Sequence, residues 1–347
     1  MTVANAPVPP PVALGEAVAE WLFSVVGLAG PLSFELIGAG GSNLTYIVTD
    51  AGNRRVVVRR PPVGSTLATA HDMRREWKVL YSLAGSGSPV PIPAPLAWLE
   101  PTGDRVGMYA MSCVEGRVLR TGADGSAMSV GEVAAASGSF VETLSEIHSV
   151  DCAAVGLEEF GRAEGYVERQ LFRWRRQYES AKVRELPLLE QIGDRLGRTV
   201  PRDQRPGSLV HGDFRFENLV LGKDSRVAAV LDWELSTRGD PVADFFWALQ
   251  YWAEPGDAFT MLPDPPTAIG TFPGRETIMN AYGSRTGLDL SEERWYRSFT
   301  WWKQAALVEG VYARRLAGVT AGAPTTNLGA IAARVDRLLS LAAEPID

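Results

Sequence analysis

The residues of this sequence that are best suited to chemistry lie between two short apolar runs in its second half. The run SLV leads into His211-Gly212-Asp213, Asn218 stands five residues after that aspartate, and the run VAAVL ends in Asp232. An aspartate at a strand end can accept a hydroxyl proton, while an asparagine and a second aspartate can hold Mg²⁺ against nucleotide phosphates. The pattern predicts phosphoryl transfer, with Asp213 as catalytic base and Asn218 and Asp232 as metal ligands.

The spacing of this segment equals that of protein-kinase catalytic loops, in which an asparagine follows the catalytic aspartate by five residues. Asp232-Trp233-Glu234 stands where kinases place their metal-binding DFG. The alternative is that these polar residues merely cap strands and turns, but three at matching offsets between two apolar runs favour catalysis. Walker A, GxSxG and HExxH motifs do not occur in the sequence, so P-loop, serine-hydrolase and zincin classes lack support.

Two neighbours of Asp213 have roles that the sequence leaves open. Arg215 follows two residues later and can contact the transferring phosphate through a bidentate fork, so we count it with the catalytic residues. Its alternative is a solvent-facing loop arginine. His211 is better suited to orienting the loop by a hydrogen bond than to moving protons itself.

A second group of candidate residues lies upstream, on the nucleotide side. The segment GAGGSN at 38–43 is a Gly-rich turn between β-rich runs, the setting of a loop that covers phosphates, although an ordinary hairpin has the same composition. Arg59 on a predicted strand and Glu76 on a predicted helix can form the ion pair that positions the α- and β-phosphates. The alternative is a basic surface cluster beside an exposed glutamate. The predicted nucleotide contacts in these two segments are Gly40, Gly41, Ser42, Asn43, Arg59 and Glu76.

The secondary-structure elements predicted to position these residues change from mainly strands to mainly helices along the chain. A helix over 12–28 is followed by β-rich runs at 34–38, 44–50 and 54–60, then by a helix over 69–84 with period 3.6 and by two more runs, PLAWLEP and VGMYAMSCV. From residue 130 the pattern becomes mainly helical. We therefore predict an α+β fold with a small antiparallel-sheet lobe and a larger helical lobe. The expected divisions are an N-terminal extension and helix at 1–30, a nucleotide-binding lobe at 31–115 and a catalytic lobe at 116–347.

These residues carry a resemblance to a known family. The chain resembles the aminoglycoside phosphotransferase and choline-kinase-like family through GAGGSNLTY, VVVRRPP, RREWKVL, the hinge-like MSCVEGR, LSEIHSVD, HGDFRFEN and LDWELSTRGDPVADFFW, over about residues 34–250. Within it, GLEEFGRAEGYVERQLFRWRRQYES and RRPP are most similar to the subgroup also fused to some acyl-CoA dehydrogenases. The resemblance implies a bilobal protein-kinase-like fold, ATP or GTP as donor, Mg²⁺ and a hydroxylated small-molecule acceptor. It also places Met111 and Cys113 at the nucleotide.

One position departs from the family pattern. Kinases and many antibiotic phosphotransferases have lysine where this chain has Arg59, and arginine is a planar fork rather than a point charge. Loss of that lysine can mark a nucleotide-binding pseudokinase that serves as a partner module. Because Asp213, Asn218 and Asp232 are all present, the sequence favours an active enzyme.

The acceptor side is less well defined. Residues 166–180 predict a helix with Arg169, Arg173 and Arg176 opposite its apolar stripe, which is either a solvated face or a surface for an anionic acceptor such as an acyl-CoA or hydroxy acid. The acidic excess after residue 117 permits a cationic acceptor instead, as in an antibiotic phosphotransferase. The Pro- and Gly-rich loop 253–275 is an acceptor-side lid or a passive insertion.

Bulk composition excludes several other classes. Apolar residues make up 46% and charged residues 22% of the 347 residues, as in a globular protein. The net charge of −7 argues against nucleic acid as partner. The sequence has no apolar run long enough for a membrane span, and its first residues lack the basic and apolar regions of a secretory signal. Its two cysteines do not suggest a disulfide framework. We therefore expect a cytoplasmic protein without membrane contact, as monomer or homodimer.

Overall fold

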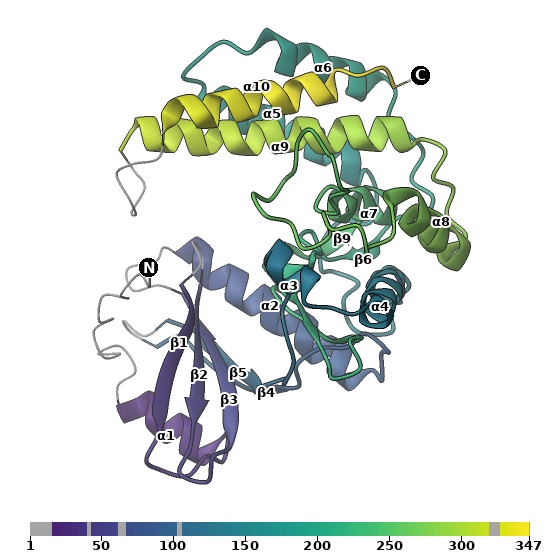
Figure 1. The fold of residues 1–347 in the computed structure, drawn as a ribbon. Coiled ribbons are helices and arrows are strands. Elements are labelled where there is room, and N and C mark those ends of the chain that lie inside the picture. Colours follow the sequence, from purple (N-terminus) through teal and green to yellow (C-terminus); the bar gives the residue numbers. More distant parts are fainter. Residues whose placement is uncertain (1–15, 40–42, 62–66, 103–105, 319–326, 347) are drawn as a thin grey trace. The chain divides into compact units, whose positions relative to one another are not determined.

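The structure is a computed structural model, and it describes residues 16–39, 43–61, 67–102, 106–318 and 327–346. It divides into two compact units (Figure 1). The first comprises residues 1–117 and 228–234, and the second comprises residues 118–227 and 235–347. The chain thus returns to the first unit for seven residues, among them Asp232. The lobe boundary that we placed after Glu115 stays a prediction.

A five-stranded antiparallel sheet forms the frame of the first unit, in the order β1-β2-β3-β5-β4. Its strands are β1 (Ser33–Ala39), β2 (Leu44–Thr49), β3 (Arg55–Arg60), β4 (Pro95–Leu99) and β5 (Met108–Ser112). A tight turn at residues 51–52 joins β2 to β3. The five strands expected from the sequence are confirmed.

Both faces of this sheet are covered, which explains why β3 reads as a continuous apolar run. Helix α1 (Glu16–Ser24) contributes to an apolar cluster with Val56 and Val58. Helix α2 (Leu67–Gly85) reaches the other face, where Glu76 meets Arg59. Side chains alternate between the faces of a strand, so Val57 and Arg59 point away from α1. Arg59 is thereby directed toward α2.

The N-terminal helix is shorter than the predicted span of 12–28. It ends at Ser24, and residues 12–15 lie outside the described residues. Beyond it, Gly27 takes a φ of +74°, a left-handed conformation that glycine adopts readily and that ends helices. The apolar periodicity therefore continues past the helix, with Val25 already 61% exposed.

The second unit is mainly helical, as predicted. Its helices are α3 (Gly122–Ser126), α4 (Val130–His148), α5 (Tyr166–Ala181), α6 (Pro187–Arg198), α7 (Pro241–Leu249), α8 (Arg275–Thr286), α9 (Glu293–Leu316) and α10 (Leu328–Ala342). Its short strands and turns are β6 (Ser208–Val210), η1 (Phe216–Asn218), β7 (Leu219–Leu221) and β9 (Thr237–Gly239). Strand β8 (Val227–Val230) and the turn η2 (Trp233–Leu235) lie where the chain passes between the units.

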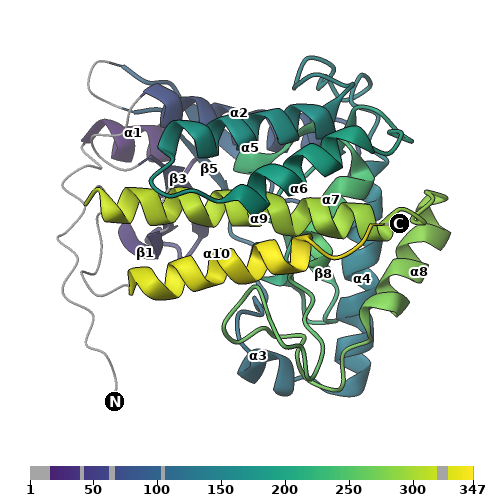
Figure 2. The ribbon, with the colours of Figure 1, turned by 90° about the horizontal axis from the view of Figure 1, so that it is seen from above.

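Helix α9 is the helix around which several others of the second unit pack. Helix α10 runs beside it, and α5, α6 and α7 also contact it (Figures 1 and 2). Phe246 of α7 stacks on Tyr296 of α9, and Trp295 stacks on Phe299 along α9 itself. Of the helices in the described part of the chain, none is long and apolar enough to cross a membrane.

Candidate active site

The turn after β6 presents Asp213. All three residues of β6 are buried, and the strand pairs with β9. The chain then turns at Gly212, which has a φ of +84°. A Cβ atom at this position would lie 2.7 Å from the backbone oxygen of Leu235. Glycine is therefore required both by its conformation and by the close approach, and it fixes where Asp213 emerges.

Asp244 on α7 holds this turn in place. Its carboxylate is 2% exposed and accepts the backbone N–H groups of His211 and Gly212, both at 2.9 Å. Nε2 of His148 lies 3.1 Å from the same group. Burial alone would raise the pKa of Asp244, but the hydrogen bond from His148 and the nearby histidines outweigh it and lower that pKa. The ionised carboxylate of Asp244 thus stabilises the turn through these hydrogen bonds. The sequence signal was an acidic residue inside the apolar helix PVADFFWAL, which we did not use.

Asp213 is held together with Asn218 and Arg215. Nδ2 of Asn218 donates to the backbone oxygen of Asp213 at 2.8 Å and to its Oδ2 at 3.0 Å. Nε of Arg215 lies 3.3 Å from the same Oδ2, and its Nη1 lies 2.7 Å from Glu217. The Arg215 guanidinium also lies 5.0 Å from the ring of Tyr251. Arg215 is therefore a partly buried neighbour of the carboxylate rather than a solvent-facing loop residue.

His211 takes part in the same turn through its ring. It is fully buried, and its Nδ1 accepts the backbone N–H of Asp213 at 3.2 Å. This is the kind of orienting hydrogen bond that the sequence favoured over proton transfer. The contact links the histidine to the backbone of Asp213 rather than to its carboxylate.

The first unit holds the nucleotide-side candidates. Nη1 of Arg59 lies 2.5 Å from Glu76, and its Nη2 lies 3.3 Å from Oδ1 of Asp232. The ion pair expected from the sequence is thus present, and it extends to the proposed metal ligand. Burial opposes the charge on Arg59, but the negative charges of Glu76 and Asp232 raise its pKa. Burial also raises the pKa of Glu76, to about 7, against the opposing charge of Arg59.

Asp232 and Glu234 emerge from a strained turn. Asp232 has a φ of +65°, which is uncommon for a residue with a side chain and often accompanies functional sites. Two residues later, Glu234 accepts a hydrogen bond of 3.0 Å from Nδ2 of Asn43. The Gly-rich segment is therefore joined to the segment that carries Asp232. Sequence patterns alone did not indicate this role of Glu234.

The other predicted nucleotide contacts have differing outcomes. Gly40, Gly41 and Ser42 lie outside the described residues. Met111 is 6% exposed within β5. Cys113 follows that strand as a partly exposed free thiol. Whether any of these residues contacts a nucleotide stays a prediction.

The residues present suit Mg²⁺ rather than a softer metal. The described residues contain no group of three or more His, Cys, Asp or Glu side chains that could hold a metal ion. The donors are instead an amide and a carboxylate, which are hard oxygen ligands of the kind that Mg²⁺ uses beside substrate phosphates. The Nδ2 group of Asn218 donates its hydrogen bonds to Asp213. Its Oδ1 atom accepts no hydrogen bond from any of the described residues. The oxygen of Asn218 in the second unit and the carboxylate of Asp232 in the first are each chemically suited to Mg²⁺, and their joint role as its ligands stays a prediction.

Sequence reasoning missed a buried lysine in the second unit. Lys303 on α9 is 9% exposed, and its Nζ lies 3.8 Å from the centre of the Trp247 ring. Within the described residues no carboxylate is close enough for an ion pair with it. Burial lowers its pKa to about 8, while the charges of Asp244 and Asp213 oppose this shift and Arg173 adds to it. The sequence signal for this buried residue was a lysine within the otherwise largely apolar segment WWKQAALV.

The predicted arginine face of α5 divides into two parts. Arg169 is used locally, since it donates to the backbone oxygens of Arg162 and Glu164. Arg173 and Arg176 are exposed. Only these two remain as candidate contacts for an anion.

Comparison with known proteins identifies the family. The family model described as the phosphotransferase enzyme family matches residues 33–264, which is more than half of the chain. The chain belongs to this family. Its match includes both the Gly-rich segment and the catalytic turn, so the resemblance stated from the sequence is confirmed.

Solved structures agree with this assignment. A crystal structure of a presumed aminoglycoside phosphotransferase from Ralstonia eutropha is 30% identical, with a TM-score of 0.78 over 94% of this chain and 96% of that one. The ternary complex of APH(2″)-IIa with streptomycin and ATP is 18% identical, with a TM-score of 0.61 over 91% of this chain and 98% of that one. At that identity the second likeness shows the fold alone. Together they confirm the predicted kinase-like fold.

Curated relatives are longer proteins. Acyl-CoA dehydrogenase family member 11 of Gallus gallus is 34% identical over 304 residues, which cover 84% of this chain and 38% of that protein. Family member 10 of Mus musculus is 32% identical over 326 residues, covering 90% of this chain and 30% of that protein. The chain thus spans less than two fifths of the length of these relatives. The predicted subgroup is confirmed.

Proposed function

We propose that this protein transfers the γ-phosphoryl group of ATP or GTP, with Mg²⁺, to a hydroxyl group of an anionic small molecule. The observation that carries the reaction is the Asp213 carboxylate, which Asn218 and Arg215 hold at the end of a buried strand. The family to which the chain belongs supports the same reaction class.

In this mechanism Asp213 accepts the proton of the acceptor hydroxyl as the new oxygen–phosphorus bond forms. The bond to the leaving nucleoside diphosphate breaks in the same step. Asn218 orients the carboxylate through its Nδ2. When bound, Mg²⁺ neutralises charge on the phosphates, and Asn218 and Asp232 are the residues that would hold it. The Arg59 and Glu76 pair would position the nucleotide.

The anionic character of the acceptor is inferred from Lys303. A buried cation without a counter-ion is unfavourable, and an incoming anion would relieve that cost. Lys303 is close enough to Asp213 for the carboxylate to influence its pKa. We infer that an acid group bound at Lys303 belongs to the same molecule that offers its hydroxyl to Asp213.

Two acceptor classes meet these requirements, namely hydroxy acids and hydroxyacyl-CoA thioesters. The second is favoured by the curated relatives, which are named as acyl-CoA dehydrogenases and contain a region similar to this chain. The phosphates of coenzyme A would also suit exposed arginines such as Arg173 and Arg176.

An antibiotic acceptor is the second candidate. It is favoured by solved structures whose names include streptomycin and kanamycin. A polycationic aminoglycoside would meet Lys303 as a like charge, which disfavours binding. The same assay decides between the two candidates.

The test measures nucleoside diphosphate release with Mg²⁺ and either ATP or GTP. The acceptor panel contains hydroxy acids, hydroxyacyl-CoAs, sugars, amino alcohols and aminoglycosides, and the Asp213→Asn variant supplies the blank. We expect release above the blank with hydroxy acids or hydroxyacyl-CoAs. Release only with aminoglycosides would overturn the anionic acceptor. Nucleotide binding without Mg²⁺ and without turnover on any acceptor would indicate a pseudokinase.

A further inference from the structure

A cavity of about 160 Å³ lies in the second unit among α7, α9, α10 and the segment that follows α7. Its apolar wall includes Phe246 and Leu249 of α7, Trp301 of α9 and Leu341 of α10. An engineered cavity of about 150 Å³ accommodates benzene. The space is therefore sufficient for one ring or a short branched chain.

This cavity is separate from the surroundings of Asp213. A smaller hollow of about 10 Å³ beside Arg215 is lined by Ala248 and Tyr251, and the two spaces share no lining residue. Successive residues are turned by roughly 100° around a helix. Phe246, Leu249 and Gln250 thus form one stripe at the end of α7, and Tyr251 points elsewhere. A ligand in the cavity would not touch the catalytic carboxylate.

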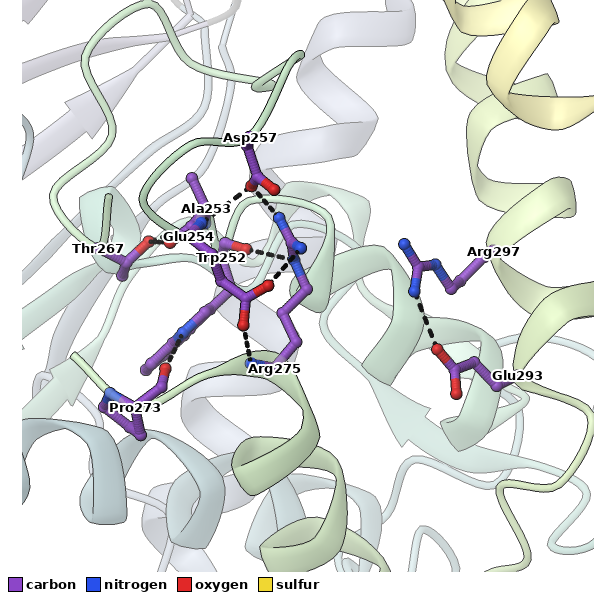
Figure 3. Close-up of polar contacts among 9 residues, drawn as sticks. All are labelled: Trp252, Ala253, Glu254, Asp257, Thr267, Pro273, Arg275, Glu293 and Arg297. Carbon is purple, nitrogen blue, oxygen red and sulfur yellow. Dashed lines mark hydrogen bonds and ion pairs between the residues drawn. The ribbon is translucent and has the colours of Figure 1, made fainter. Parts of the chain in front are cut away.

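The wall formed by the loop 253–275 is held in a defined position (Figure 3). Arg275 donates to the backbone oxygen of Trp252 at 2.7 Å and pairs with Glu254 at 2.8 Å and with Asp257. Across the loop, the hydroxyl of Thr267 bonds both backbone groups of Ala253, at 2.8 and 3.0 Å. Such a preformed wall is typical of small-molecule sites. The charge of Arg275 is already neutralised by its two carboxylates.

The inner end of the cavity carries polar atoms that need partners. Gln250 is 8% exposed and Thr300 is 2% exposed, so both lie deep in the space that they line. Neither amide atom of Gln250 nor the hydroxyl of Thr300 has a hydrogen-bond partner among the described residues. Buried polar groups in proteins are nearly always satisfied. A group that both donates and accepts hydrogen bonds, such as a hydroxyl, would satisfy them.

The outer end carries charges of both signs. Arg337 is exposed at the cavity and has no ionic partner in the described part of the chain. Arg297, also at the cavity, pairs at 2.9 Å with Glu293 on the surface (Figure 3), and an exposed pair of this kind is weak. Asp257 and Glu344 also line the space, but Asp257 is engaged by Arg275. An anion at the opening would find Arg337 available.

We propose that this cavity is a second small-molecule site, which binds an organic acid with an apolar body of ring size. The carboxylate lies at Arg337, the body lies against Trp301 and Leu249, and a hydroxyl at the far end meets Gln250 and Thr300. This site goes beyond the proposed phosphotransferase reaction and does not depend on it.

The test is a calorimetric titration of the full chain with 4-hydroxybenzoate. We expect saturable one-to-one binding. The cationic analogue 4-hydroxybenzamidine should bind at least about tenfold more weakly, because it places like charge at Arg337. Benzoate, which lacks the hydroxyl, should also bind more weakly.

Variants locate the probe. Arg337→Glu should weaken binding by about tenfold or more, while Arg198→Glu, an exposed control on α6, should not. Thr300→Val is nearly isosteric and removes a hydroxyl without a partner, so the fold should tolerate it while affinity falls. Asp213→Asn should bind the probe as the wild type does. The absence of saturable binding, equal affinity in Arg337→Glu, or loss of binding in Asp213→Asn would each overturn the proposal.

Discussion

At the scale of residues, the proposed reaction rests on one carboxylate, that of Asp213. Asp213 is oriented by Asn218 from the chain that follows it and by the His211 ring from the chain that precedes it. Asn218 and Arg215 both contact Oδ2 of its carboxylate. The arrangement suits a base that must accept a proton from a bound hydroxyl.

Asp213→Asn should lower kcat by about 10²–10⁴-fold, the usual contribution of a general base, and leave nucleotide affinity nearly unchanged. Steady-state kinetics and a nucleotide titration measure the two effects. Asp224→Asn is the control, because Asp224 is an exposed residue of the next turn. Equal kcat values in Asp213→Asn and the wild type would rule out Asp213 as the base.

Lys303 should give acceptor binding a distinctive pH dependence. Its pKa is about 8, so its positive charge is present below pH 8 and is lost as the pH rises through that value. The KM for an anionic acceptor should therefore rise above pH 8, whereas the KM for the nucleotide should not follow it. The measurement is a KM profile between pH 6 and about 9.5, which spans both forms of a group of this pKa.

Lys303→Met should show a high acceptor KM at every pH, without the rise near pH 8. Lys223→Met changes an exposed lysine of the turn between β7 and β8 and should keep the wild-type profile. A rise that persists unchanged in Lys303→Met would assign it to another group.

At the scale of elements, the turn between β6 and η1 depends on one glycine. Gly212→Ala places a Cβ against the backbone of Leu235 in a left-handed conformation. We expect a loss of unfolding free energy of about 1–3 kcal/mol, with a fall in kcat because Asp213 is displaced. Chemical denaturation measures the first effect. Gly131→Ala is the control, since a Cβ there meets no atom within 4 Å. Equal stability of both variants would contradict this role.

The pairing of β3 with α2 should matter for the nucleotide. Arg59→Met leaves Glu76 buried without its cation, which costs about 3–5 kcal/mol of stability, and it should raise the nucleotide KM. The double variant Arg59→Met with Glu76→Gln should recover part of the stability but not the nucleotide affinity. Recovery of both would mean that Arg59 is only structural.

Sequence patterns anticipated the elements better than the contacts between them. The five strands, α2 and the catalytic turn follow from local periodicity and glycine positions, and they were predicted. Asp244 and Lys303 were missed, because their importance comes from burial beside residues distant in the chain. The end of α1 was misplaced, since apolar periodicity does not mark where Gly27 turns the chain.

For the molecule as a whole, the central claim is Asp213-dependent phosphoryl transfer to an anionic hydroxylated acceptor. The most direct measurement is mass spectrometric detection of the phosphorylated acceptor after incubation with Mg²⁺ and ATP or GTP. We predict a phosphomonoester of a hydroxy acid or hydroxyacyl-CoA, formed in equal amount with the nucleoside diphosphate and absent with Asp213→Asn. Absence of a phosphomonoester from every acceptor, or its equal formation by Asp213→Asn, would contradict the claim.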